Sequence, residues 1–186
     1  SRELIMSVTL RLIAEEGIDA VTHRRVAEIA GVSPGTTTHH FAGREGLLRE
    51  SFISYLSSVD ALFARFYATA AQDGPMAVDS VREAFVQLVE REFADPSLLR
   101  AEYELMLFAS QDDELGQAVT AWDARAAGAI AAVMEQSGAR RPTEAARTLI
   151  NFIRGFELER LVNTNLSVKE FESRLTPLLR ALCHLE

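Results

Sequence analysis

Apolar residues recur every three or four positions along nearly the whole chain, and this spacing predicts a protein built of α-helices. The pattern is clear from the start, where Leu4, Val8 and Leu12 would share one helical face. Strand-like alternation of apolar and polar residues does not stand out. Only 10 glycines and 5 prolines occur among the 186 residues, and their scarcity also favours helix. We therefore expect an all-α fold.

Helix start and stop signals divide the chain into about nine helices. Thr22, Ser33 and Ser167 are typical N-cap residues, whereas Gly17 and Gly31 follow the end of a helical pattern. Three short helices, ending near residues 17, 30 and 41, are expected to form a head, residues 1–45. Six longer helices form a body, residues 46–186, at about 44–72, 76–93, 95–110, 112–136, 141–163 and 167–182. The long fourth helix would connect the two parts rigidly.

The segment from Thr22 to Phe41 predicts a helix, a tight turn and a short second helix. Ala27 is small enough to let the two helices approach closely, and Gly31 can adopt the positive φ angle of a sharp turn. Val32 and Phe41 would anchor the second helix to the core. This arrangement is typical of a helix-turn-helix, whose second helix enters the major groove of DNA.

The second helix of this segment consists of a run that is polar throughout, made of Gly35, three threonines, His39 and His40. So short a helix with almost no apolar face is unstable alone, and in isolation such a run would be a solvated surface turn. Directly after a helix and a turn, however, it stands where a recognition helix would be. Its short donors and acceptors suit contacts with bases and phosphates.

Charge is distributed in a way that suits DNA contact by one face only. The whole chain has a formal net charge of −8, which argues against a protein that coats nucleic acid. Residues 20–50, in contrast, carry four arginines and three glutamates, together with His23, His39 and His40. A mildly basic segment on an acidic body favours local contact with phosphates.

The same segment resembles the DNA-binding part of the TetR family of bacterial transcription regulators. The residues that carry the resemblance are Val26-Ala27, Ala30-Gly31-Val32-Ser33, Gly35, His40-Phe41, Arg44, Leu47 and Leu48. The close match covers residues 4–50, and the lengths of the following helices are similar in plan. The resemblance implies a homodimer with a DNA-reading head and a ligand-sensing body, usually a repressor that leaves its double-stranded operator when a small molecule binds.

The chain departs from the family pattern in the recognition helix and just after it. The family usually has an apolar residue at position 37 and a phosphate-contacting Tyr at position 38, but both are Thr here. His39 is a candidate to take over that phosphate contact. The family also usually has Lys at position 44, where Arg44 keeps the charge at the start of the fourth helix, a place that already favours phosphate.

Base-edge contacts are expected from Thr36, Thr37 and His39, although the Thr37 methyl group could instead pack in the core. These side chains belong to the helix that would lie in the major groove. The complete set of expected DNA contacts is Thr22, Arg25, Ser33, Gly35, Thr36, Thr37, Thr38, His39, His40 and Arg44.

Phosphate contacts are expected from three further members of this set, each with an alternative. Thr22 could cap its helix and also donate to phosphate, or only cap it. Arg25 could reach the DNA backbone or be an ordinary solvated helix residue. The resemblance assigns a phosphate contact to His40, with packing beside Phe41 as the alternative.

The body is rich in aromatic residues, most of which are expected to be plain core. The resemblance implies a ligand cavity between the fourth and eighth helices, which some of these side chains would line. Polar residues within apolar runs, such as Arg100 and Asn151, would anchor the ligand, unless they lie on the surface or in ion pairs. The candidates for binding a small, largely apolar molecule are Phe63, Tyr67, Phe85, Arg100, Tyr103, Met106, Trp122, Asn151, Phe152 and Phe156.

The last two helices carry more apolar residues than exposed terminal helices need. The core of a single molecule could absorb them, but we expect a four-helix interface with a second copy. The candidate interface residues are Ile153, Phe156, Phe171, Leu175 and Leu178.

Other classes of protein find little support in the sequence. Cys183 is the single cysteine, so no internal disulfide can form and a reducing cytoplasm is expected. We expect no metal site, no cofactor and no membrane span, and the opening residues favour an amphipathic helix over a signal peptide. A nucleophile–base pair is not evident. The alternatives left are an all-helical enzyme or an interaction module that does not bind DNA.

Overall fold

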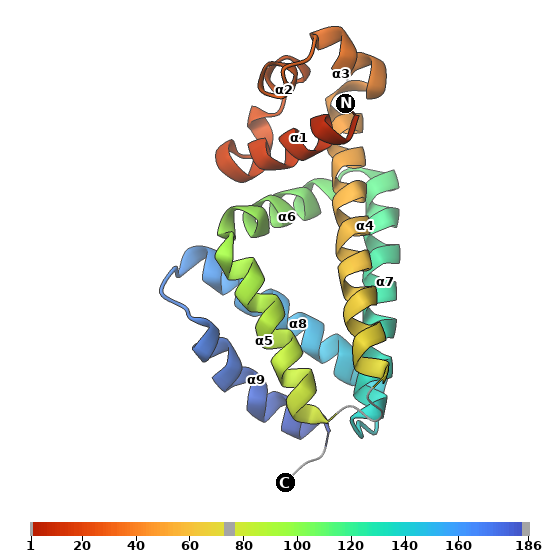
Figure 1. Cartoon of the computed structure of the whole chain (residues 1–186), viewed down its shortest axis with the longest axis vertical. Coiled ribbons are helices and arrows are strands. Elements are labelled where there is room, and N and C mark those ends of the chain that lie inside the picture. The colour runs from red at the N-terminus through yellow and green to blue at the C-terminus, as the bar shows by residue number, and fades with distance from the viewer. Residues whose placement is uncertain (1, 73–76, 184–186) are drawn as a thin grey trace. The chain divides into compact units, whose positions relative to one another are not determined.

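The computed structural model describes residues 2–72 and 77–183, with the side chains of residues 62, 63 and 65–72 outside that description. Within these ranges the chain forms nine α-helices and no strand, as Figure 1 shows, so the expected all-α fold is confirmed. The helices are α1 (Arg2–Glu16), α2 (His23–Ala30), α3 (Pro34–His40), α4 (Gly43–Gln72), α5 (Val78–Ala94), α6 (Pro96–Ala109), α7 (Asp113–Gln136), α8 (Pro142–Val162) and α9 (Val168–Leu182).

The expected capping residues stand at the starts of their helices, where their side chains bind free backbone N–H groups. The hydroxyl oxygens of Thr22, Ser33 and Ser167 each accept a hydrogen bond from the backbone N–H three residues further on, with N–O distances of 3.1–3.2 Å. Such a bond satisfies one of the free donors at a helix start. A short 3₁₀ turn, η1 (Ile18–Ala20), separates α1 from α2 and was not expected from the sequence.

The N-terminal unit is a compact part of the structure formed by Ser1–Val59 and Pro96–Trp122. It contains α1 to α3, the first part of α4, α6 and the beginning of α7. Helix α1 packs against α2 on one side and α6 on another (Figure 1). Among the residues of this core that are buried almost completely are Leu12, Ile13, Leu47, Phe52 and Leu105. The segment from Thr22 to Phe41 therefore packs together with α6 in one unit.

An ion pair joins α4 to the start of α7 inside the N-terminal unit. The Nη2 atom of Arg49 lies 2.7 Å from Oδ2 of Asp112. Oδ1 of Asp112 accepts a hydrogen bond from the backbone N–H of Leu115, at 2.9 Å, and so caps α7. The hydrogen bond from Arg49 and this cap hold the pKa of Asp112 below its usual value, because both stabilise the carboxylate form.

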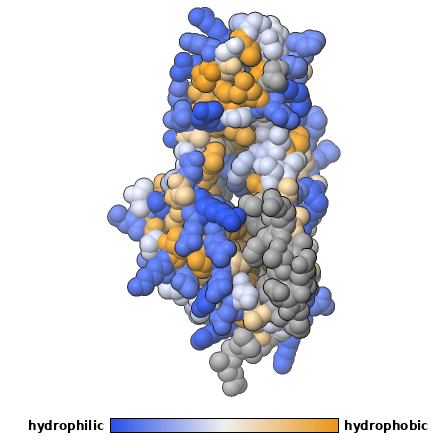
Figure 2. Space-filling model, in the orientation of Figure 1, coloured by the Kyte–Doolittle hydropathy of each residue, from blue (hydrophilic) through white to orange (hydrophobic). Residues whose placement is uncertain are grey.

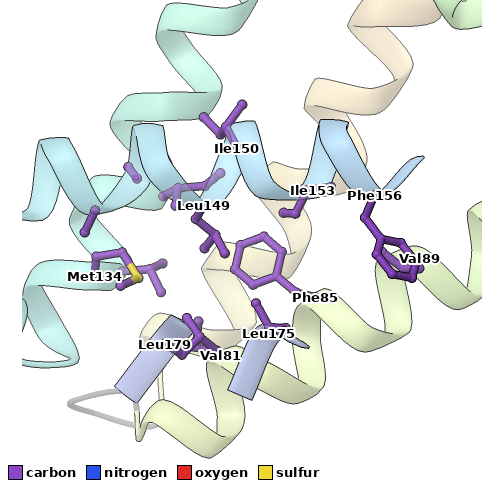
Figure 3. Close-up of a cluster of buried hydrophobic side chains, with 14 of the residues drawn as sticks. Val81, Phe85, Val89, Met134, Leu149, Ile150, Ile153, Phe156, Leu175 and Leu179 are labelled. Carbon is purple, nitrogen blue, oxygen red and sulfur yellow. The ribbon is translucent and has the colours of Figure 1, made fainter. Parts of the chain in front are cut away.

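The C-terminal unit is formed by Asp60–Asp95 and Asp123–Glu186. Its core lies where α5, α8 and α9 meet the second part of α7 (Figure 3). Phe85 from α5, Ile153 from α8 and Leu175 from α9 point toward one another there (Figure 3). The rings of Phe156 and Phe171 meet edge to face, with centroids 5.2 Å apart, an arrangement that aromatic pairs favour.

The expected interface residues of the last two helices belong to this core, so the structure favours the alternative that a single molecule absorbs them. Ile153, Phe156, Phe171 and Leu175 are each at most 7% exposed within one molecule, and Leu178 packs against the same cluster. Side chains buried by α5 in their own chain are not available to a second copy. The core of a single molecule thus absorbs the apolar excess that suggested an interface.

The molecular surface is mostly hydrophilic on the face in Figure 2, with apolar areas between the charged side chains. Large apolar residues that are exposed in the described parts of the chain include Leu4, Ile29, Leu107, Leu158 and Val162. None of the described helices is both long and apolar enough to cross a membrane.

Candidate nucleic-acid interface

Helices α2 and α3 pack against each other and form the helix-turn-helix that the sequence predicts. Gly31 ends α2 with a φ angle of +66°, in the left-handed region that glycine adopts at little cost. The backbone N–H of Val32 donates to the Ala27 carbonyl oxygen at 3.0 Å, which closes the last turn of α2. Pro34, directly after the Ser33 cap, then starts α3. The chain therefore passes from α2 to α3 within three residues.

Helix α3 carries exposed polar side chains, as a recognition helix must. Thr38 and His39 are exposed, and Thr36 and His40 are half-buried. The Thr36 and Ser33 hydroxyl oxygens lie 2.9 Å apart, in hydrogen-bond contact. The rings of His39 and His40 meet edge to face, with centroids 5.5 Å apart. Among the exposed residues of α3, His39 has the longest side chain, with a donor and an acceptor on one ring.

Thr37 lies on the opposite, inward face of α3. Its side chain is completely buried, and its hydroxyl donates to the Pro34 carbonyl oxygen at 2.8 Å. A base-edge contact by Thr37 is incompatible with this burial, so the structure favours the packing alternative. Where the family usually has an apolar residue, a threonine here satisfies its hydroxyl within its own helix.

Arg44 is engaged with the backbone of its own molecule rather than left free for phosphate. Its Nε atom donates to the Val21 carbonyl oxygen at 2.9 Å, and its Nη2 atom donates to the Ile18 carbonyl oxygen at 2.7 Å. The carboxylate of Asp19 lies 3.7 Å from the same guanidinium. The phosphate contact predicted for Arg44 stays a prediction, but the side chain has a structural role beside it.

Arg25 is exposed and surrounded by carboxylates. Its Nη2 atom lies 2.9 Å from Oε1 of Glu16, and Glu28 is 3.8 Å from the guanidinium. The hydrogen bond to Glu16 raises the pKa of Arg25 above its ordinary value, although the group is charged in any case. An approaching phosphate would have to compete with these carboxylates. Contact of Arg25 with DNA remains a prediction.

Comparisons with known proteins decide the family. A sequence model described as "Bacterial regulatory proteins, tetR family" matches residues 5–51. A second, described as "Tetracyclin repressor-like, C-terminal domain", matches residues 76–185, which is more than half of the chain. The chain belongs to the TetR family. The resemblance first noted in the DNA-binding segment thus extends to the helices that follow it.

Individual relatives agree with this placement. The HTH-type transcriptional regulator BetI 2 of Chromohalobacter salexigens is 36% identical over 77 residues, which cover 41% of this chain and 37% of the relative. The match therefore spans little more than a third of that curated relative. Among solved structures, the putative transcriptional regulator SCO7518 from Streptomyces coelicolor A3(2) is 30% identical, with a TM-score of 0.72 over 99% of this chain and 96% of the other. The multidrug binding protein EbrR, solved with ethidium, is 26% identical, with a TM-score of 0.69 and coverage of 95% and 96%.

The candidate ligand residues of this TetR-family chain fall into both compact units. In the C-terminal unit, Phe85 and Phe156 are buried core residues, Phe152 packs against them, and Asn151 is exposed. The side chains of Phe63 and Tyr67 lie outside the described residues. The aromatic members of this unit thus have the plain core role that most such residues were expected to have.

The candidates in the N-terminal unit are four: Arg100, Tyr103, Met106 and Trp122. Arg100 is exposed and pairs with Glu104 on its own helix, at 2.9 Å. Met106 is partly buried and packs against the core cluster that contains Trp122. The ion-pair alternative therefore describes Arg100 in this structure.

Trp122 has a property that its sequence position does not reveal. Its side chain is 8% exposed, and its indole nitrogen is buried without a hydrogen-bond partner among the described residues. A buried N–H group without an acceptor is uncommon in proteins, because it loses its bond to water on folding. The side chains of His23 and Ser51 in the same unit also have buried polar atoms without a partner among the described residues.

Two further observations concern a metal site and a contact between distant parts of the chain. Among the described residues, no group of three or more His, Cys, Asp or Glu side chains is placed to hold a metal ion. Glu104 was one of the polar residues within apolar runs, but sequence reasoning missed the contact of its carboxylate with the turn before α2. No local signal could have found it, because its partner lies 86 positions away in the chain.

Proposed function

We propose that this chain is a ligand-responsive regulator of transcription that binds a double-stranded DNA operator as a homodimer. In this proposal residues 1–45 contact DNA, and residues 46–186 bind the ligand and the second copy. The observation that carries it is the exposed polar face of α3, a capped helix that follows a tight turn from α2 in a TetR-family chain. The usual outcome in the family, repression, is part of the proposal, as is a location in the cytoplasm.

DNA binding is tested by a footprint on the DNA that flanks the gene of this protein. We expect protection of a two-fold symmetric site with half-sites separated by one helical turn or a multiple of it, because a symmetric dimer places two identical heads. Binding to no fragment, at low as well as physiological salt, would favour the alternatives of an interaction module or an enzyme.

His39 and Thr36 are proposed to contact base edges, and their replacement tests this. His39→Ala is expected to relax the preference at one position of each half-site, because a contact to a base edge discriminates by about 1–3 kcal/mol. Thr36→Val, which keeps the shape but removes the hydroxyl, should do so at a neighbouring position. Binding selections with randomised half-sites give the measurement, and Ser57→Ala on the exposed face of α4 is the control. Unchanged preferences in both variants would exclude α3 as the reader of sequence.

The ligand is proposed to be a small, largely apolar molecule with one hydrogen-bond acceptor. Trp122 supports the acceptor, because its buried indole N–H has no partner among the described residues. The similar structure of EbrR, a multidrug binding protein, was solved with ethidium, which supports an aromatic ligand. Ligand sites of this kind are apolar with few polar anchors.

Ligand binding and operator binding are expected to oppose each other. A thermal-shift screen of apolar compounds would supply a ligand, and fluorescence of Trp122, the single tryptophan, would report its binding. Operator DNA should weaken ligand binding by the factor by which the ligand weakens operator binding. Trp122→Phe keeps an aromatic side chain, although a smaller one, and removes the N–H. It should lower ligand affinity about tenfold, as loss of one buried hydrogen bond does, and calorimetry measures this variant. A ligand that binds with the same affinity in the presence and absence of operator DNA would not be the effector.

The dimer is proposed to use the outer face of α8, since the inner face is core. The exposed residues Thr148, Asn151, Gly155, Leu158 and Val162 follow one another at helical spacing of three and four. Such a spacing places them on one face of the helix. We call this face the α8 stripe. Leu158 is 48% and Val162 90% exposed, and large apolar side chains in such a position are typical of a protein interface.

A further inference from the structure

The 3₁₀ turn η1, between α1 and α2, forms hydrogen bonds with two charged side chains. One comes from α6 and the other from the first turn of α4, so both are remote from the turn in sequence. Both bond to the same residue, Ile18: Glu104 accepts from its N–H, and Arg44 donates to its carbonyl oxygen. A single peptide segment thus connects α6 with the start of α4.

The contact from α6 is made by the carboxylate of Glu104, which Arg100 holds in position. Oε2 of Glu104 lies 2.6 Å from the Ile18 nitrogen, and Oε1 accepts from Nε of Arg100 at 2.9 Å. A hydrogen bond to a charged acceptor is roughly twice as strong as one between neutral groups. Gly17, just before the turn, has a φ angle of +90°, which side chains rarely tolerate. The turn therefore follows a sharp change of direction that the carboxylate secures.

The α4 side is a two-point contact. The Arg44 guanidinium donates to the Ile18 and Val21 carbonyl oxygens, at 2.7 and 2.9 Å. Its planar fork of donors can hold two acceptors at once, whereas the ammonium group of lysine is a point charge. Val21 is completely buried and directly precedes Thr22, the cap of α2. The guanidinium thus holds the segment that leads directly into the cap of α2.

We infer that Glu104 and Arg44 are positioning residues for DNA binding, which act together by fixing η1 and through it α2 and α3. The inference rests on the proposed function. Helix α2 begins directly after the segment that Glu104 and Arg44 bind, and it packs against α3. The Thr37 hydroxyl of α3 lies 3.4 Å from the His23 carbonyl oxygen in the first turn of α2. A displaced η1 would therefore move the exposed face of α3.

The rival explanation for Arg44 is a direct phosphate contact, and the two make different predictions. A phosphate contact survives Arg44→Lys in large part, and its loss lowers the salt dependence of binding by about one unit. A positioning role requires the fork, so Arg44→Lys should weaken binding nearly as much as Arg44→Ala. Its loss should leave the salt dependence unchanged, because the number of phosphate contacts is the same.

The experiment measures binding to the footprinted DNA by fluorescence anisotropy over a range of salt concentrations. Full-length variants are compared at a temperature at which each is folded by circular dichroism. Glu104→Ala should weaken binding about tenfold, the typical effect of losing one hydrogen bond to a charged group. Glu104→Gln keeps an acceptor for the Ile18 N–H and should lose much less. The matched control is Glu102→Gln, which removes the same charge from α6 at a carboxylate bonded to Tyr55 instead, at 2.7 Å.

A double-mutant cycle tests whether the two residues act through one turn. Glu104→Ala with Arg44→Lys should bind hardly more weakly than the worse single variant, because residues that share a partner are not additive. Strictly additive losses, or an equal loss in Glu102→Gln, would overturn the inference. Failure of the unmodified protein to bind any DNA would overturn the proposed function and the inference with it.

Hydrogen exchange provides a readout that needs no DNA. The Ile18 amide should exchange at least about ten times faster in Glu104→Ala than in the unmodified protein, because exchange requires the donor to be free. The Tyr55 hydroxyl contact of Glu102 involves no backbone amide, so Glu102→Gln should leave Ile18 protected. Unchanged protection in Glu104→Ala would show that the carboxylate does not hold the turn, even where DNA binding is normal.

Discussion

Replacing Phe171 by alanine is expected to lower the free energy of unfolding by about 3–5 kcal/mol, the usual cost of removing a buried aromatic ring. Phe171 is completely buried in α9, and its ring lies between those of Phe152 and Phe156, at centroid distances of 5.6 and 5.2 Å. Both neighbours come from α8, so the loss would separate two helices of the C-terminal unit. Equilibrium unfolding in urea, followed by circular dichroism, measures the change.

The control is Ser173→Ala, two residues further along α9 and exposed. Exposed substitutions of this kind change stability by no more than about 0.5 kcal/mol. The measurement is repeated at two protein concentrations, because a contact within one molecule gives a loss that does not depend on concentration. A Phe171→Ala protein that unfolds like the unmodified one but no longer dimerises would contradict the core position of this ring.

The helices could be predicted because their signals are local. Caps such as Thr22 and Ser33 act on N–H groups three residues away, and Gly31 acts on the turn in which it stands. Apolar spacing likewise depends on neighbours within two turns. These signals placed the boundaries of α2 and α3 closely. The turn η1 escaped, because its bonds come from Glu104 and Arg44, distant residues whose approach depends on the whole unit.

The direction of buried faces could not be predicted from the same signals. Phe171 and Leu175 have the spacing of an apolar face, but spacing does not say whether α5 or a second molecule covers it. In the structure, α5 packs against α9 and covers this face. Similarly, the polarity of α3 indicated contacts with DNA but did not separate exposed His39 from buried Thr37. The apolar residue that the family usually has at position 37 was the one sign of that burial, and the structure decides for it.

The second large effect is expected at the α8 stripe, where a charge should abolish the dimer without harming the fold. Val162 is 90% exposed and stands at the end of α8, so Val162→Asp removes no contact within the molecule. In a dimer this carboxylate would be buried against apolar side chains, which is costly without a partner. We expect the variant to be a folded monomer in sedimentation at micromolar concentrations, at which we expect the unmodified protein to be a dimer.

Loss of the dimer should in turn weaken specific DNA binding by at least about a hundredfold, because the second head no longer benefits from the high effective concentration that the first provides. Leu107→Asp is the matched control: it makes a similar change at an apolar side chain of α6 that is 72% exposed, outside the α8 stripe. It should remain a dimer with normal affinity for the operator. A monomeric unmodified protein, or a Val162→Asp protein that is still dimeric while Leu107→Asp is not, would place the interface elsewhere. The Val162→Asp protein could also be a monomer that binds one half-site, and the whole operator, as tightly as the unmodified protein does. That result would show that the two heads bind DNA independently.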